Sequence, residues 1–366
     1  MKLNKSYKIR LYPNDEQIQF FEQNFGNVRF IYNKMLGDKI NHYKKTKEML
    51  HNTPAQYKKE YDFLKLSDSL ALSNAQLALN KAYKMFFRNP KKFGFPKFKS
   101  KNKSKMAYTT NNQNGTIFIE DGKLKLPKVG FVETVQDRKF IKNSKIKSVT
   151  ISKTRTNKYF ASILVEYEKD IQQVQPKSFL GLDYSMSAFF VDSEGNKGDY
   201  PKFYRLSYEN LAKEQRKLSK MKKGSNNYNK QKIQIAKIHE KIANQRKDFL
   251  HKMSRKITNS YDVVCVENLN MKAMSQMFKF GKSVHDNGWG MFVSMLEYKL
   301  AELGKFLIKA DKFFPSTKQC SSCGEKQDMP LSARTYECPN CGLNIDRDLN
   351  AALNLKQYGI SKLKLT

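Results

Sequence analysis

The sequence predicts a multidomain protein of mixed α+β and α/β class, with a helical and β-rich N-terminal half followed by alternating strands and helices. Three observations support this prediction. The chain of 366 residues is long enough for two or three domains with separate cores. Apolar residues recur at helical spacing up to about residue 90, short alternating runs follow, and strand–helix alternation begins after residue 175. Residues 171–178 (IQQVQPKS) have a linker-like composition, so we expect a domain boundary near residue 175.

The first ninety residues begin with a strand and continue as helices. Residues 2–12 alternate in polarity and end at Pro13, which predicts a strand closed by a turn. Asn14 is suited to cap the next helix, because an Asn side chain accepts hydrogen bonds from the first backbone amides. That helix carries apolar residues three or four positions apart, and Gly37 is expected to end it. A second amphipathic helix is predicted over residues 67–87.

The remaining segments show strand and helix patterns in turn. Residues 116–167 contain short alternating runs separated by turn residues, which predict a β-rich module or barrel. The elements expected after it are a strand–turn–strand unit over residues 179–196, a basic helical hairpin over 209–258, a buried strand over 261–269, a helix over 289–304 and a strand over 305–310. The buried strand is predicted to be central, because its run VVCV is wholly apolar.

The charge balance indicates a polyanionic partner. There are 68 Lys and Arg residues against 34 Asp and Glu residues, a formal net charge of +34. Nucleic acid is favoured over an anionic membrane surface, and no run of 18 apolar residues predicts a membrane-spanning helix. The basic N-terminus lacks the apolar core of a secretory signal, so we expect a cytoplasmic, nucleoid-associated location and no membrane partner.

The basic residues concentrate in two segments. Residues 81–108 hold ten Lys and Arg residues, seven aromatic residues and no acidic residue. Residues 213–256 hold fifteen Lys and Arg residues against three acidic residues. A solvated loop has no need of so many aromatic residues, so both segments are expected to contact nucleic-acid backbones. The predicted contact residues are Lys84, Arg88, Lys91, Lys92, Lys97, Lys99, Lys101, Arg246, Lys247 and Lys252.

Four of the five cysteines have the spacing of a metal site. Cys320, Cys323, Cys338 and Cys341 form the pattern C-x2-C-x14-C-x2-C, and Gly324 and Gly342 follow the two pairs. This pattern predicts one tetrahedral Zn²⁺ in a zinc ribbon. Closure by four protein ligands leaves no position for a catalytic water, so the zinc is expected to be structural. The fifth cysteine, Cys265, lies in the apolar strand and is expected to be a core residue.

Carboxylates stand at the ends of three predicted elements. Asp183 follows FLGL, Glu267 follows VVCV, and Asp346 and Asp348 occur in NIDRDLNAALNL. Any one of them has an ordinary explanation as a cap or turn residue. A sheet of the RNase H type would bring them together, and clustered carboxylates favour divalent cations between them. Two Mg²⁺ ions about 4 Å apart would suit phosphodiester hydrolysis. Asp348 is favoured as the third acid, with Asp346 as the alternative.

The motifs of this chain, in their order along the sequence, resemble those of the TnpB family of transposon-encoded RNA-guided nucleases, which is ancestral to type V CRISPR effectors. The resemblance rests on GLD (181–183), VVCVENL (263–269), CSSCG (320–324) and CPNCGLNIDRDLNAALN (338–354), with KIRLYPNDEQ and KFGFPKFKS in the N-terminal half. It implies a RuvC-type DNA endonuclease of prokaryotic origin, encoded by an insertion sequence. Such an enzyme uses a guide RNA from the transposon end and cuts target double-stranded DNA beside a short adjacent motif.

The resemblance also implies roles for the residues and domains. Asp183, Glu267 and Asp348 would be the catalytic acids, and the cysteines would hold zinc in a ribbon over about residues 312–345. The implied domains are a wedge-like β-barrel from residues 1–12 and 106–175, a helical recognition domain over 13–105, and an RNase H-like (RuvC) nuclease domain over 176–366. Two alternatives remain, a compact type V CRISPR effector and a nuclease-inactive RNA-guided DNA-binding repressor.

Overall fold

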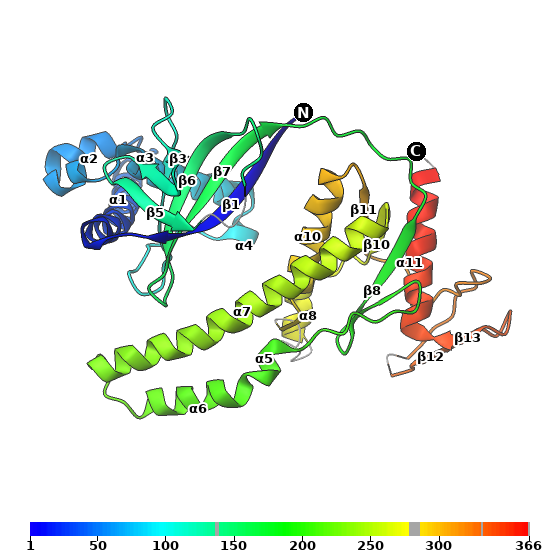
Figure 1. Cartoon of the computed structure of the whole chain (residues 1–366). Coiled ribbons are helices and arrows are strands. Elements are labelled where there is room, and N and C mark those ends of the chain that lie inside the picture. The colour runs from blue at the N-terminus through cyan, green and yellow to red at the C-terminus, as the bar shows by residue number, and fades with distance from the viewer. Residues whose placement is uncertain (136–138, 278–285, 331, 365–366) are drawn as a thin grey trace. The chain divides into compact units, whose positions relative to one another are not determined.

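The computed structural model describes residues 1–135, 139–277, 286–330 and 332–364 (Figure 1). The chain divides into two compact units, Met1–Asp170 and Ile171–Thr366. Each unit has its own hydrophobic core. The division falls at the first residue of the linker-like segment IQQVQPKS.

The first unit joins a seven-stranded antiparallel sheet to a group of helices. Its helices are α1 (Asp15–Thr46), α2 (Pro54–Glu60), the 3-10 helix η1 (Asp62–Leu66), α3 (Ser69–Arg88) and α4 (Pro90–Phe93). Its strands are β1 (Lys2–Tyr12), β2 (Met106–Asn111), β3 (Phe118–Glu120), β4 (Lys123–Leu126), β5 (Gly130–Val135), β6 (Lys145–Lys153) and β7 (Tyr159–Glu168). The strand order is β2-β6-β7-β1-β5-β4-β3, so the N-terminal strand lies inside the sheet that the later strands form. Within the described residues no pairing joins the edge strands β2 and β3.

Helix α1 connects the two parts of this unit. Asn14 caps it as predicted, because its side chain accepts from the amide of Gln17 while the Gln17 side chain accepts from the Asn14 amide. Phe21 and Phe25 in its first half pack against the sheet, and later residues pack against α3. The prediction that Gly37 ends the helix is wrong, because α1 continues to Thr46. A helical glycine costs only about 1 kcal/mol, which the packing beyond it offsets.

The second unit is built on a four-stranded, mainly parallel sheet. Its strands are β8 (Phe179–Ser185), β9 (Phe189–Asp192), β10 (Val263–Val266) and β11 (Phe306–Lys309), with a separate hairpin of β12 (Thr335–Glu337) and β13 (Asn344–Asp346). Its helices are α5 (Phe203–Leu206), α6 (Tyr208–Ser219), α7 (Asn226–Ser260), α8 (Met271–Met277), α10 (Trp289–Glu302) and α11 (Arg347–Lys364). The sheet order is β11-β10-β8-β9, and β8, β10 and β11 are parallel. The predicted central strand and basic helical hairpin are therefore confirmed as β10 and α6–α7.

Helices cover both faces of this sheet. Alternate residues such as Leu182 and Val266 pack against α7 and α10. Cys265, between Val264 and Val266, packs instead against Leu355 of α11, as expected of a core thiol. Burial raises its pKa to about 12, so it stays protonated. Because side chains alternate along a strand, Gly181 and Asp183 of β8 lie on the same face as Cys265, the face that α11 covers. Continued alternation places Glu267, one residue past the end of β10, on this face as well.

Candidate metal centre and acidic cluster

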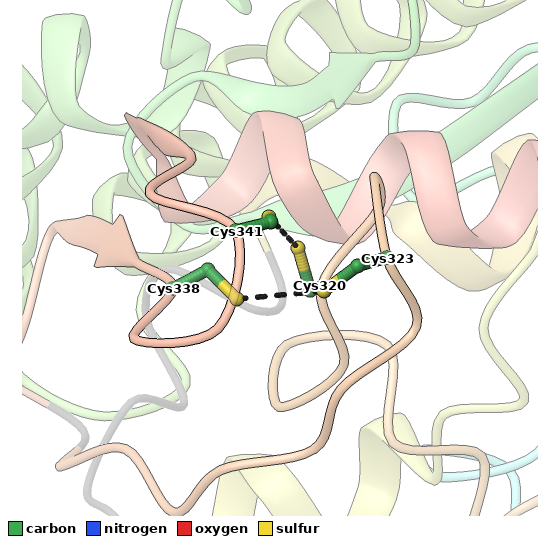
Figure 2. Close-up of side chains that lie close together, drawn as sticks. All are labelled: Cys320, Cys323, Cys338 and Cys341. Atoms are coloured by element: carbon green, nitrogen blue, oxygen red, sulfur yellow. Dashed lines mark hydrogen bonds between the residues drawn. The ribbon is translucent and has the colours of Figure 1, made fainter.

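Four cysteine sulfurs converge between β11 and α11 (Figure 2). The Sγ atoms of Cys320 and Cys341 are 3.6 Å apart, as are those of Cys323 and Cys338, and all four lie within 4.8 Å of one another. A disulfide would require about 2.0 Å, so these are free thiols. A tetrahedral ion with Zn–S bonds of about 2.3 Å needs sulfurs about 3.8 Å apart. The observed spacing fits such an ion, and the predicted ligands are therefore brought together.

The two cysteine pairs are held by equivalent turns. The amide of Gly324 donates to the Cys320 carbonyl, and the amide of Gly342 donates to the Cys338 carbonyl. Both glycines have positive φ angles, 81° and 73°, a conformation that other L-residues adopt with strain. A backbone amide at Glu325, helped by the Asn340 side chain, lowers the pKa of Cys323 to about 6. This thiol is therefore readily deprotonated into the form that binds metal.

Helix α11 anchors the cysteine segment through two asparagines four residues apart. The Asn350 side chain donates to the Gln319 carbonyl at 2.7 Å and accepts from the Ser321 amide at 2.9 Å. Asn354 donates to the carbonyls of Ser316 and Gln319 at 2.8 and 2.6 Å. Both side chains are buried and satisfied. The first cysteine pair is thus fixed to the helix that also carries Asp348.

The parallel register places two of the predicted acids side by side. Leu182 of β8 pairs with Val266 of β10, so Asp183 and Glu267 are the next residues of neighbouring strands. Such positions are about 4.8 Å apart across a sheet, and both side chains point to the α11 face. Ser316 donates its hydroxyl hydrogen to Oε1 of Glu267. The loop before the cysteines therefore also orients one of the acids.

Close packing of α11 brings the third acid to the same face. Gly181 makes this possible, because a Cβ there would stand 1.9 Å from the Ala352 carbonyl oxygen. Asp348 lies in the first turn of α11 and is 20% exposed. Asp346 instead accepts from the amides of Asp348 and Leu349 and so caps the helix. Asp346 thus has a structural explanation, whereas the described part of the chain gives Asp348 only a 3.5 Å ion pair with Arg347.

The acids interact electrostatically. Burial raises the pKa of Asp183 well above its usual value, and repulsion from Glu267 and then Asp348 raises it further. Burial also raises the pKa of Glu267, against the Ser316 hydrogen bond, and Asp348 adds to the increase. Within the described residues, however, only the cysteines form a group of three or more ligating side chains close enough to share one ion. The carboxylates are neighbours that repel one another, and Glu267 is turned toward Ser316.

An open hollow lies beside the segment that follows Glu267. Residues Asn268–Met271, which directly follow Glu267, line it together with Lys312, and its volume is about 500 Å³. A cationic side chain in such a position suits a phosphate group.

The predicted nucleic-acid contacts divide into exposed and internal residues. Those with exposed side chains are Lys84, Arg88, Lys91, Lys92, Lys97, Lys101, Lys247 and Lys252. Lys252 is paired with Asp248 on the surface of α7 at 2.7 Å. Lys99 is half-buried, its ammonium lies 3.8 Å from the centre of the Tyr32 ring, and burial lowers its pKa, while its contact with nucleic acid stays a prediction.

Arg246 has internal partners. It donates to the Tyr200 hydroxyl at 3.3 Å and to the buried Asp286 carboxylate at 3.5 Å. The density of basic residues in 213–256 gave no sign of these contacts, because Tyr200 and Asp286 come from other segments of the chain. The contact of Arg246 with nucleic acid stays a prediction.

Sequence reasoning missed Ser316, Asn350 and Asn354. The two asparagines carried a signal, because polar residues four apart on the apolar face of a helix need partners when buried. Ser316 carried none, since its role depends on a contact with Glu267 from a distant segment.

Three family profiles match the chain. Residues 162–277 match the IS605 OrfB family, described as "Probable transposase", and residues 289–355 match the Cas12f1-like TNB domain. Residues 1–48 match a "Helix-turn-helix domain" of the same OrfB family, although the structure shows there a strand and one long helix, β1 and α1. No described helix is both long and apolar enough to cross a membrane.

The fold is multidomain and similar to that of a solved Cas12f1 structure. A solved structure titled "Cryo-EM structure of the Cas12f1-sgRNA-target DNA complex" matches 97% of this chain and 99% of that chain with a TM-score of 0.61, at 13% identity. A "Putative RNA-guided DNA endonuclease" of Streptomyces pristinaespiralis is 31% identical over 98% of this chain and 90% of its own. The protein InsQ of Escherichia coli K12, with the same description, is 27% identical over 98% of this chain and 93% of its own. The chain belongs to the TnpB family.

Proposed function

We propose that this protein is an RNA-guided DNA endonuclease of RuvC type that hydrolyses DNA with Asp183, Glu267 and Asp348. The observation that carries the proposal is the gathering of three carboxylates from β8, β10 and α11 on one face of the sheet. Their mutual repulsion and burial disfavour ionisation, which is an unfavourable arrangement unless a bound cation offsets it. The descriptions of the relatives as RNA-guided DNA endonucleases supply the substrate class.

Mg²⁺ suits this set of oxygen ligands. It usually binds one or two carboxylates together with waters and substrate phosphate oxygens, so the site does not need three acids around one ion. Bound as a pair, such ions would supply an activated water and stabilise the leaving oxygen of the cleaved bond. Asp183 and Glu267 would hold them from adjacent strands and Asp348 from α11, while Ser316 orients Glu267. The hollow beside Glu267 offers room for the phosphate backbone, and Lys312 offers it a positive charge.

The four cysteines would hold one structural Zn²⁺ in a zinc ribbon spanning about residues 312–345. The proposal rests on sulfur spacing that fits a tetrahedral ion. Bound zinc would fix the segment that Asn350 and Asn354 attach to α11. The metal would thereby help to keep Ser316 beside Glu267.

The N-terminal unit would bind RNA and read DNA. In this proposal residues 1–12 and 106–175 act as a wedge-like barrel, residues 13–105 as a helical recognition domain, and residues 176–366 as the nuclease domain. Base pairing with the guide would supply sequence specificity, while the protein contacts phosphates and a short motif beside the target. The exposed Lys and Arg side chains of residues 81–108 and of α6–α7 would neutralise those phosphates.

A compact type V CRISPR effector is the second candidate, favoured by the likeness to the Cas12f1 fold. The two candidates differ in the source of the guide RNA. The test is to purify the protein from cells that carry its native flanking DNA, sequence the RNA bound to it, and assay cleavage of a matching plasmid. RNA from the transposon end with guided cleavage supports the proposal. RNA transcribed from a repeat array supports the CRISPR candidate, and a protein that binds matching DNA without cutting it is the repressor.

A further inference from the structure

Exposed phenylalanines crowd one short stretch of the N-terminal unit. Phe87 at the end of α3 and Phe98 beyond α4 are 61% and 60% exposed, and Phe93 and Phe95 are 43% and 45% exposed. Phenylalanine is ordinarily buried, so four exposed rings within twelve residues of the chain indicate a candidate binding site. We call these four residues the aromatic patch.

The patch is held rigidly from beneath. Phe87 stacks on Tyr83 with ring centres 6.1 Å apart and planes 22° apart, and Tyr83 is buried in the helical core. Phe86 meets the Phe87 ring at 5.3 Å, and the edge of Phe95 contacts both Phe86 and Tyr83. Phe87 is therefore fixed in place by its neighbours while most of its surface faces solvent. A ring ordered in advance loses little conformational entropy when a flat ligand stacks on it.

The segment that carries Phe98 is also fixed. The Asn33 side chain on α1 donates to the Lys99 carbonyl and accepts from the Lys99 amide, both at 2.8 Å. The Lys99 ammonium lies on the Tyr32 ring, and the Phe98 ring lies 3.8 Å from where a Cβ on Gly37 would be. The glycine inside α1 thus lies beneath Phe98. Two helices together support the patch.

The charge around the patch selects among possible occupants. Residues 81–108 contain no acid. Lys84, Arg88, Lys91 and Lys97 are exposed, and no ion pair joins them to a carboxylate within the described residues. A second copy of the chain would bring the same positive surface against itself, which like-charge repulsion opposes. Single-stranded nucleic acid offers unpaired bases that can stack on the Phe rings and phosphates that can pair with the Lys and Arg side chains, so it matches both features of this surface.

We infer that Phe87 and Phe98 are stacking platforms for unpaired bases of RNA, with the surrounding Lys and Arg side chains holding the adjacent phosphates. This inference rests on the proposed function for the identity of the RNA. The target DNA arrives as a duplex, whose base faces are already stacked on one another. The guide RNA is the partner that presents unpaired bases before a target is bound, and proteins read RNA mainly at such bases.

The test measures binding separately from cleavage. RNA-free full-length protein is titrated with a short unstructured RNA, with DNA of the same sequence and with an RNA duplex, at several salt concentrations. Phe87→Leu keeps an apolar side chain but removes the aromatic face, and it should weaken binding of single-stranded RNA about tenfold. Phe87→Trp should retain binding. Leu77→Ala alters another exposed apolar residue of α3 and should have no effect.

Salt dependence separates stacking from charge. Phe87→Leu should leave the slope of log affinity against log salt unchanged, whereas Lys84→Ala should lower its magnitude by about 0.7. The inference is overturned if Phe87→Leu leaves RNA binding intact, weakens duplex binding equally, or affects only the DNA oligonucleotide. It is also overturned if wild-type protein is a dimer that Phe87→Leu dissociates, since the occupant is then a second copy. If plasmid is cleaved but Phe87→Leu does not affect RNA binding, the proposed function holds and the stacking inference fails. If Phe87→Leu weakens RNA binding as expected but no plasmid is cleaved, the stacking inference holds and the proposed function fails.

Discussion

Gly181→Ala is expected to disrupt the acidic cluster without altering any acid. The added Cβ would stand 1.9 Å from the carbonyl oxygen of Ala352 and 2.6 Å from the amide nitrogen of Lys356. Ordinary van der Waals contact begins at about 3.4 Å, so α11 would have to move by roughly 1.5 Å (3.4 − 1.9). The opposing atoms belong to a helix backbone and cannot rotate away. Overpacking of this kind costs about 3 kcal/mol.

The same displacement should reduce cleavage. Asp348 is carried on α11, and a misplacement of about 1 Å at a reacting group costs on the order of 100-fold in rate. We expect the unfolding midpoint of Gly181→Ala to fall by about 6–12 °C and guided plasmid cleavage to fall by about two orders of magnitude. Gly290→Ala in α10 is the matched control, since a Cβ there meets nothing within 4 Å. A Gly181→Ala protein as stable and active as wild type would refute the packing of α11 described here.

Three other perturbations give distinct expectations. Replacing Cys320 and Cys323 with Ser should release zinc, measured by metal analysis, and lower the unfolding midpoint, whereas full stability with no bound zinc would contradict the tetrahedral site. Ser316→Ala should weaken Mn²⁺ binding, measured by electron paramagnetic resonance, about tenfold, because Glu267 loses its orienting hydrogen bond. Ser316→Thr keeps the hydroxyl and should bind Mn²⁺ like wild type. Equal Mn²⁺ affinities of Ser316→Ala and wild type would contradict the role of Ser316 in orienting Glu267. Burial lowers the pKa of Lys299 to about 8, so its charge is disfavoured in the folded state and that penalty disappears as pH rises from about 8 toward 10.5. Compared with Lys299→Met, wild-type stability should therefore improve between pH 7 and pH 9.5, and a difference independent of pH would contradict the burial of the charge.

The sequence predicted those features that depend on local periodicity and spacing. The apolar run VVCV identified the central strand β10. A sheet of the RNase H type was expected to unite Asp183 and Glu267, and the parallel register of β8 and β10 makes them neighbours. The C-x2-C-x14-C-x2-C pattern identified the cysteine centre, because the chain folds each pair into its own turn. The glycine of the motif GLD, Gly181, leaves the space against which α11 packs.

Features that depend on distant segments were not predicted. Arg246 was named as a nucleic-acid contact from the density of basic residues, which gave no sign of its ion pair with Asp286, forty residues further along the chain. Lys99 was expected to meet phosphate, and its contact with Tyr32, which α1 contributes, was not predicted. Gly37 was expected to end α1, although later packing sustains the helix. For Gly37, tertiary packing outweighed a local preference worth about 1 kcal/mol.

Substitution of Asp183 tests the central claim most directly. Asp183→Ala should abolish guided cleavage of plasmid DNA while binding of guide RNA and target DNA persists, because the proposed function assigns this carboxylate to hydrolysis and not to recognition. Asp346→Asn is the matched control, since Asn also caps helices and the residue is proposed to have no catalytic role. This second variant should cut plasmid DNA like wild type. Undiminished cleavage by Asp183→Ala would contradict the proposed active site.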